Sequence, residues 1–229
     1  MTVLGQAALG IWMDIAPGVE DDFERWYREQ HFPERLAVPG FLRGRRYRTA
    51  REAPTFFTLY ETENADVLRS PEYMARLNNP TDWTRRVLPN MRNVVRNAYR
   101  LIHTVGIGMG RAVITLRLDP LPGREDQLRQ RYQGEVLAGL TRVPDVLSAS
   151  LFEAEPVATG VITEERKLVG TMGTASPFLC ICEARELGLI HHPAWKALTG
   201  PEGPARQDIV HGFTENPYHL MHALQRPRA

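Results

Sequence analysis

Apolar and polar positions along the first hundred residues shift several times between alternation and helical spacing, which predicts a series of short elements. Alternating apolar and polar residues are typical of strands, whereas apolar residues three or four positions apart indicate a helix. The predicted elements are, in order, a strand over 8–15, a helix over 19–36, strands over 41–48 and 55–62, a broken helix over 65–77, a short helix over 81–88 and a strand over 92–103.

The second half of the chain repeats short segments of the first half in the same order. The matched pairs are 17–18 with 122–123, 39–42 with 144–147, 56–62 with 178–184, 70–73 with 192–195, and 97–101 with 216–220. The offset between partners is 105 for the first two pairs, 122 for the next two and 119 for the last. Five weak matches in one order indicate an internal duplication, which is a strong constraint on the fold.

A β-α-β-β-α-β order is that of the ferredoxin-like unit, and one such unit leaves a sheet face that a second can cover. We therefore expect an α+β protein of two tandem ferredoxin-like units that fold against each other as an internal pseudo-dimer. The first domain is predicted over 1–105 and the second over 110–229, with a glycine-rich linker at 106–110. The change of offset places an insertion at 159–176, whose Gly, Thr and charged residues predict an extended hairpin or flap.

Composition and charge narrow the classes of partner. The chain has 229 residues with 24% charged and 43% hydrophobic residues, and its net charge of +1 argues against nucleic acid or a membrane surface as the main partner. The sequence contains no apolar run near 18 residues, so no transmembrane helix is predicted. Asp14 interrupts the apolar N-terminal stretch, which therefore indicates a strand and not a signal peptide. Cys180 and Cys182 lie two apart in a predicted strand. Free buried thiols suit the reducing cytoplasm, and two cysteines alone do not make the ligand set of a zinc site.

The first predicted helix carries the best candidate site. Phe23, Tyr27 and His31 are spaced by four and share the face that points toward the sheet. In the second copy Val136 takes the place of His31, so apolar packing is sufficient there. A buried histidine is costly unless it is hydrogen-bonded or faces a pocket. His31 is therefore a satisfied core histidine, a general acid or base, or a ligand to a metal or haem.

Other candidates have both a structural and a functional interpretation. Tyr73, Trp83 and Phe57 are either plain core residues or part of a pocket near His31, and Trp26 lies beside it on the helix. The arginines near the second strand indicate either a solvated strand edge or a site for an acidic substrate. They are Arg43, Arg45, Arg46, Arg48 and Arg51.

A local motif surrounds His31. Residues 26–35, Trp-Tyr-Arg-Glu-Gln-His-Phe-Pro-Glu-Arg, are followed by Val-Pro-Gly-Phe at 38–41 and Arg-Arg-Tyr at 45–47. This segment resembles the EthD-like members of the dimeric α/β-barrel (ferredoxin-like) superfamily. The resemblance implies two ferredoxin-like units packed sheet to sheet as an intramolecular dimeric α/β barrel. Relatives include cofactor-free monooxygenases, a lactone isomerase, polyketide cyclases and haem enzymes resembling chlorite dismutase.

The resulting hypothesis is a cofactor-independent enzyme of the isomerase, cyclase or monooxygenase type that acts on a small apolar or aromatic molecule. His31 acts as general acid or base and Tyr27 orients it or binds the substrate, while Trp26, Phe57, Tyr73 and Trp83 line the pocket. No metal site is expected. The alternatives are a haem-binding oxidoreductase and a non-catalytic barrel that binds a small molecule. The pseudo-dimer could pair again as a homodimer.

Overall fold

The computed structural model describes residues 3–49, 51, 54–155 and 162–226, and the chain folds into two compact units. Most of unit 2 comes from the first half of the chain, and most of unit 1 comes from the second half. Unit 2 comprises Leu4–Arg100, Glu155–Ala175 and Met221–Ala229, and unit 1 comprises Met1–Val3, Leu101–Ala154 and Ser176–Leu220.

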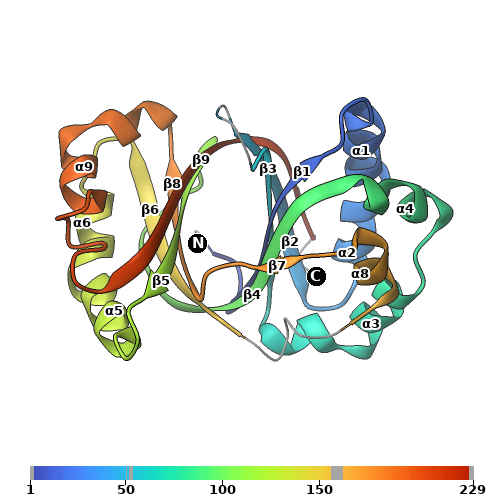
Figure 1. Ribbon diagram of the computed structural model, residues 1–229, viewed down its shortest axis with the longest axis horizontal. Coiled ribbons are helices and arrows are strands. Elements are labelled where there is room, and N and C mark those ends of the chain that lie inside the picture. The colour runs from blue at the N-terminus through green and yellow to red at the C-terminus, as the bar shows by residue number, and fades with distance from the viewer. Residues whose placement is uncertain (1–2, 50, 52–53, 156–161, 227–229) are drawn as a thin grey trace. The chain divides into compact units, whose positions relative to one another are not determined.

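Unit 2 is a sheet with helices on one face (Figure 1). Its strands are β1 (Ala7–Ile15), β2 (Phe41–Thr49), β3 (Phe56–Thr62) and the first part of β4 (Met91–Gly106), in the antiparallel order β4-β1-β3-β2. Its helices are α1 (Glu20–Trp26), α2 (Phe32–Ala37), α3 (Pro71–Asn78) and α4 (Asp82–Val87), with 3₁₀ turns at Ala65–Arg69 and Leu88–Asn90. The end of β9 (Val210–Gln225) lies next to β2, and the Arg226 N–H donates to the Leu42 carbonyl at 2.9 Å.

Unit 1 has the same strand order, β9-β5-β8-β6, with its helices again on one face (Figure 1). Its own strands are β5 (Ala112–Pro120), β6 (Val146–Ala154), β8 (Phe178–Ala184) and the first part of β9. Its helices are α5 (Glu125–Arg131), α6 (Leu137–Thr141) and α9 (Pro193–Thr199), with a 3₁₀ turn at Leu187–His191. The end of β4 lies next to β6, where the Thr104 and Ser150 hydroxyls are 3.0 Å apart. The predicted β-α-β-β-α-β order is thus confirmed in each unit.

The predicted helix over 19–36 contains a wider turn. Tyr27–His31 is π-helical, and the Phe32 N–H donates to the Tyr27 carbonyl five residues back. Pro33 fits this region because it has no N–H to donate. The same wide turn occurs at Tyr132–Val136 in unit 1, where Ala138 stands in the place of Pro33, so proline is not its cause. π-Turns are frequent at functional sites.

Each unit has its own hydrophobic core between its sheet and its helices. The unit 1 core is apolar throughout the matching helix, where Val136 is fully buried. In unit 2 the equivalent layer instead buries ionisable side chains, among them His31 and Arg35. The candidate site therefore lies in unit 2.

The arginines of β2 do not form the solvated strand edge that was one interpretation of the sequence. Arg43 and Arg45 are buried against the Glu61 carboxylate, at 2.8 and 2.7 Å, because Glu61 faces them from the neighbouring strand β3. Arg46 is buried as well and pairs with Glu24 of α1 at 2.7 Å. A solvated strand edge describes Arg48 better, because its side chain is half exposed.

The insertion differs from the predicted hairpin. Its described part forms α8 (Glu164–Val169) and the two-residue strand β7 (Gly173–Thr174), which pairs in parallel with β4. Thr163 caps α8 by accepting from the Arg166 N–H, acidic residues occupy its first turn, and Gly170 ends it at φ 79°. Residues 159–161 of the predicted insertion lie outside the described residues.

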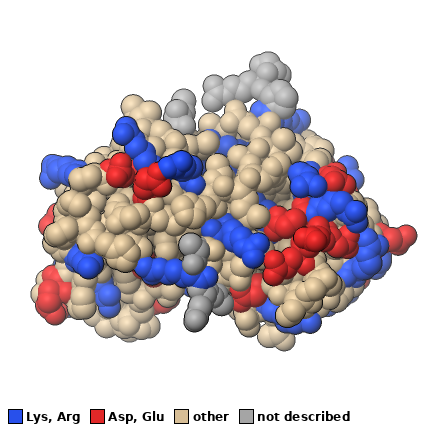
Figure 2. Space-filling model, turned by 90° about the horizontal axis from the view of Figure 1, so that it is seen from above, with Lys and Arg blue, Asp and Glu red and all other residues tan. Residues whose placement is uncertain are grey.

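The surface is mixed in charge. Figure 2 shows acidic and basic side chains interspersed on the face it displays, with no broad area of one sign outside the grey atoms. None of the helices formed by the described residues combines the length and the apolar character needed to cross a membrane.

Two glycines offer a matched test of the turn that leads into β2. Gly40 and Gly18 both have left-handed backbones, at φ 84° and 82°, but an added Cβ would lie 2.4 Å from Val67 at Gly40 and meet nothing within 4 Å at Gly18. Gly18→Ala should lower the free energy of unfolding by about 1–2 kcal/mol through backbone strain. Gly40→Ala should lower the free energy of unfolding by about 1–3 kcal/mol more than Gly18→Ala does, because its Cβ overpacks against Val67. Urea denaturation measures both values. Equal losses would contradict this packing.

Candidate functional site

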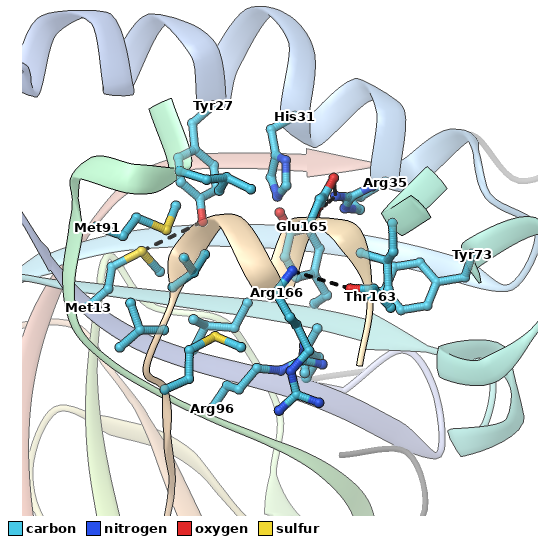
Figure 3. Close-up of a pocket in the computed structure, with 18 residues that line it drawn as sticks. Met13, Tyr27, His31, Arg35, Tyr73, Met91, Arg96, Thr163, Glu165 and Arg166 are labelled. Atoms are coloured by element: carbon cyan, nitrogen blue, oxygen red, sulfur yellow. Dashed lines mark hydrogen bonds and ion pairs between the residues drawn. The ribbon is translucent and has the colours of Figure 1, made fainter. Parts of the chain in front are cut away.

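Unit 2 contains a cavity of about 70 Å³ between its helices and its sheet (Figure 3). The residues around it come mainly from β1, the π-turn, α2, β3, α3, β4 and α8. Most of the wall is aliphatic or methionine, for example Leu9, Met13, Leu77, Met91, Val169 and Met172. A mostly apolar wall with a few polar groups is the usual form of a small-molecule site.

His31 points into this cavity from the π-turn (Figure 3). Its side chain is packed against the Trp26 ring, with ring centroids 4.2 Å apart, and against the edge of Tyr27 at 5.0 Å. The residue is 6% exposed, and its Nδ1 is buried without a hydrogen-bond partner among the described residues. A backbone carbonyl that would satisfy this nitrogen as part of an ordinary core is therefore not found in the described structure.

The surroundings keep His31 neutral. Burial lowers the pKa of His31 well below its usual value of 6.5, and the positive charges of Arg35 and Arg46 lower it further. Arg46 lies over the Tyr27 ring, 3.9 Å from its centroid. An uncharged imidazole in an apolar wall can accept a proton, which is what a general base requires.

Two tyrosines lie beside the histidine in the cavity wall. The Tyr27 hydroxyl contacts the Met13 sulfur at 3.9 Å, which is a weak interaction. The Tyr60 hydroxyl is buried with no hydrogen-bond partner within the described parts of the chain. Burial raises the pKa of Tyr27, and it raises the pKa of Tyr60 well above 10. Both hydroxyls therefore keep their protons at neutral pH and can donate to a ligand oxygen.

A buried ion pair connects α8 to the helix of His31. Arg35 on α2 donates from Nη2 to both carboxylate oxygens of Glu165, and the two side chains are 3% and 11% exposed. Burial acts to lower the pKa of Arg35, but the Glu165 charge outweighs it and the net pKa is raised. Arg35 therefore stays charged, and the pair holds α8 over the cavity (Figure 3).

The residues predicted for the site separate into two groups. Tyr27, His31 and Tyr73 line the cavity. Trp26 lies behind His31, and its indole N–H donates to Thr84 at 3.1 Å. Their roles in binding or chemistry remain predictions.

Phe57 and Trp83 lie elsewhere. Phe57 stacks on Trp12, with centroids 4.8 Å apart, on the sheet face opposite Tyr60, because strand residues three apart point to opposite faces. The Trp83 indole N–H donates to Asp22 of α1 at 3.1 Å.

Sequence reasoning missed part of the cavity wall, namely Arg35, Tyr60, Arg96, Glu165 and Arg166. A signal existed for the first two, because the matching residues of the second half are Leu140 and Cys182, which are apolar and buried. No such comparison was available for Glu165 and Arg166, because they lie in the insertion.

No group of three or more His, Cys, Asp or Glu side chains in the described residues has the arrangement of a metal site. Cys180 and Cys182 are free and buried in β8, and their sulfurs are 4.0 Å apart.

No family model matches the chain, and no curated protein matches its sequence. Solved structures do resemble it. An anthrone oxidase-like protein is 13% identical with a TM-score of 0.59, covering 96% of this chain and 92% of its own. A candidate monooxygenase from Fusobacterium nucleatum is 10% identical with a TM-score of 0.58, covering 98% and 96%. A haem-binding protein from Thermus thermophilus is 10% identical with a TM-score of 0.53, covering 97% and 93%.

These likenesses show the fold. The chain has the α+β, ferredoxin-like architecture found in dimeric α/β-barrel proteins, as the sequence predicted.

The burial of His31 predicts a pH dependence of stability. Its folded pKa lies below its unfolded value, so between the two values the unfolded chain binds a proton that the folded chain does not. Stability should therefore fall as the pH drops below about 6.5, by up to about 1.4 kcal/mol per pH unit from this group. His31→Val should remove that part of the slope and leave stability at pH 8 almost unchanged, as measured by urea denaturation across pH.

The control is His103→Asn, because His103 is exposed on β4 and should leave the slope as it is. The pKa of His222 is also lowered, by burial and then by Arg28. Because His222 is present in wild type and in both variants, its contribution to the slope is the same in all three proteins. An unchanged acid-side slope in His31→Val would contradict a depressed His31 pKa.

Removal of the Glu165 charge should loosen α8. Glu165→Gln leaves the Arg35 guanidinium buried without its counter-ion, a change that costs about 3–5 kcal/mol in buried pairs. Amide hydrogen exchange in 163–169 should become faster than elsewhere in unit 2. Glu164→Gln is the control, because Glu164 is half exposed and pairs with Lys167 on the surface. Equal exchange in the two variants would show that the pair does not hold α8.

Proposed function

We propose that the chain is a cofactor-independent enzyme of the isomerase, cyclase or monooxygenase type, in which His31 abstracts a proton from a small apolar or aromatic substrate. The observation that carries the proposal is a neutral, buried histidine with an unpartnered Nδ1, among the described residues, at an apolar cavity. The three reaction types share a first step in which a weakly acidic C–H or O–H loses a proton to a base. The matching Val136 of unit 1 supports a role for His31 beyond packing.

The tyrosines fit this step. Proton loss next to a carbonyl places negative charge on oxygen, and donors already in position stabilise that charge in a dry site. Within the described structure Tyr60 has a free, buried hydroxyl, and the Tyr27 hydroxyl contacts the Met13 sulfur weakly and lies near the Thr58 hydroxyl. Both stay protonated in the relevant pH range because burial raises the pKa of each. We assign to Tyr27 and Tyr60 the stabilisation of the substrate oxyanion, and to Tyr73 contact with the substrate body.

Membership in the EthD-like family is part of the proposal. It rests on the motif at 26–35, in which the tyrosine and the histidine bound the π-turn Tyr27–His31 and the proline lies in the first turn of α2, directly after it. A cytoplasmic location also remains a proposal, supported by the two free buried thiols.

The cavity must open to accept an aromatic molecule. Its volume of about 70 Å³ is about half that of a 150 Å³ protein cavity known to bind benzene. The aliphatic sheet side of the wall is fixed by strand pairing. By contrast, α8 is a short helix that ends at Gly170 and is joined to the neighbouring helices by side-chain contacts, among them the Arg35–Glu165 ion pair and the bond from the Glu164 N–H to Asn78. We infer that α8 moves outward when substrate enters and closes over it afterwards, which excludes water from the reaction.

The haem alternative fits the residues poorly. Haem iron needs an axial ligand such as histidine, and His31 is the one buried histidine among the described residues. Haem is much larger than the small aromatic molecule proposed above, and the buried Arg35–Glu165 pair lies in the wall beside His31, where a haem would have to fit. We therefore derive no step through haem.

The test is deuterium incorporation from heavy water into ketone probes, followed by mass spectrometry. Anthrone and 2-tetralone both carry acidic C–H groups, and exchange reports proton abstraction whatever the later steps are. We expect the enzyme-dependent exchange rate to fall by about 10²-fold or more in His31→Val and by a smaller factor in Tyr27→Phe. His103→Asn should retain the wild-type rate, since His103 lies on the surface.

A non-catalytic binding protein gives a different result. It would bind the probes and give the same exchange rate in wild type and His31→Val. That outcome, in variants whose melting curves show an intact fold, would overturn the proposed function.

A further inference from the structure

Two arginines lie on the side of the cavity away from His31 (Figure 3). Arg96 comes from β4, where it is adjacent to the short strand β7, and Arg166 comes from the middle of α8. Both are partly buried. Because they come from a rigid strand and from the inserted helix, they approach each other only when α8 is in place.

The Arg96 guanidinium is incompletely paired. Its Nε is buried and has no hydrogen-bond partner among the residues that the structure describes. A buried guanidinium nitrogen without an acceptor costs free energy, so such a group indicates that an acceptor is supplied from outside the chain.

Positive side chains are prominent in the cavity wall. In the described part of the chain, Arg35, Arg96 and Arg166 line the cavity together with the Glu165 carboxylate, which accepts from Arg35. Burial lowers the pKa of Arg166, and the nearby positive charge of Arg96 lowers it further. The two guanidinium groups therefore repel each other in a partly dry setting, and an anion between them would remove that repulsion.

We propose that the substrate is an apolar molecule that bears a carboxylate, and that Arg96 and Arg166 bind this carboxylate. The inference rests on the proposed function, because it takes the His31 cavity as the ligand site. A carboxylate suits the arginine pair because guanidinium forks donate two parallel hydrogen bonds to its oxygens. The apolar body then lies along Met13, Met91 and Met172, whose flexible side chains adapt to its shape.

The arginine pair determines which substrate atom reaches His31. With its acid end held between β4 and α8, an apolar body extends toward His31 and Tyr27 on the opposite wall (Figure 3). Carboxylate binding also strengthens the contact between α8 and the sheet, since one anion bridges a residue of each. Substrate binding and closure of α8 are thereby coupled.

The experiment compares two fluorescent probes of equal size, 2-naphthoate and the neutral 2-naphthylmethanol, by titration at low salt. Wild type should bind 2-naphthoate at least about tenfold more tightly, a difference of about 1.4 kcal/mol, because the guanidinium groups make charge-assisted hydrogen bonds to the carboxylate and not to the alcohol. Arg96→Met should weaken 2-naphthoate binding about tenfold and leave 2-naphthylmethanol within twofold. The double variant Arg96→Met/Arg166→Met should lose the preference for the acid.

Lys167→Met is the matched control. It removes the same charge from the adjacent position of α8, but Lys167 is exposed and pairs with Glu164, so both affinities should stay within twofold. Equal binding of the two probes to wild type, no binding of 2-naphthoate, or an acid preference that survives in the double variant would overturn the carboxylate site. In each case His31-dependent exchange of the ketone probes would still report separately on the proposed function.

A second measurement needs no ligand. Arg96→Met removes the repulsion of Arg166 and only a small attraction to Glu165, which Arg35 already pairs with, so its melting temperature should equal or exceed that of wild type. A marked fall in melting temperature would show that Arg96 supports the fold through an internal contact, and would overturn the site.

Discussion

The Arg35–Glu165 ion pair connects the inserted helix to the helix that carries His31, and the character of the cavity follows from this contact. With α8 in place, the space between the helices and the sheet is small and mostly apolar. The low polarity of this space disfavours a charged imidazole, and the arginine charge nearby disfavours it further. One buried contact therefore covers the histidine and contributes to its neutral state, and under the proposed function it would link binding to proton transfer through the position of α8.

The two units share one backbone arrangement but differ in the polarity of the buried layer between helices and sheet. Both have the same strand order and the same π-turn, yet one places Val136, Leu140 and Cys182 where the other places His31, Arg35 and Tyr60. The apolar unit satisfies its packing without buried charge in this layer. The polar unit contains several buried nitrogen and oxygen atoms without hydrogen-bond partners among the described residues, which is costly for a fold and useful for a site.

Much of this could be predicted from the sequence, because strands and helices leave local patterns. The first helix, its inward face and the break in the helix predicted over 65–77 all follow from spacing, and the break falls where a 3₁₀ turn ends and α3 begins. Phe57 was misplaced because the side of a sheet that a residue faces depends on register, and register is not visible in one strand. Arg43 and Arg45 were misjudged because their partner Glu61 comes from another strand, where alternation alone gives no sign of a buried charge. The insertion was the hardest part, since its helix is short and its contacts are all distant in sequence.

The sharing of β4 and β9 between the units affects when the protein can fold during synthesis. The sheet that carries the His31 cavity is bordered by residues at the end of β9, and Arg226 donates to the carbonyl of Val38, 188 positions earlier. Pairing over so long a separation is slow, and a ribosome must complete most of unit 1 before the edge of β2 can be covered. Until then β2 presents an open edge of unpaired backbone N–H and C=O groups, which is where the nascent chain is most prone to pair with another chain.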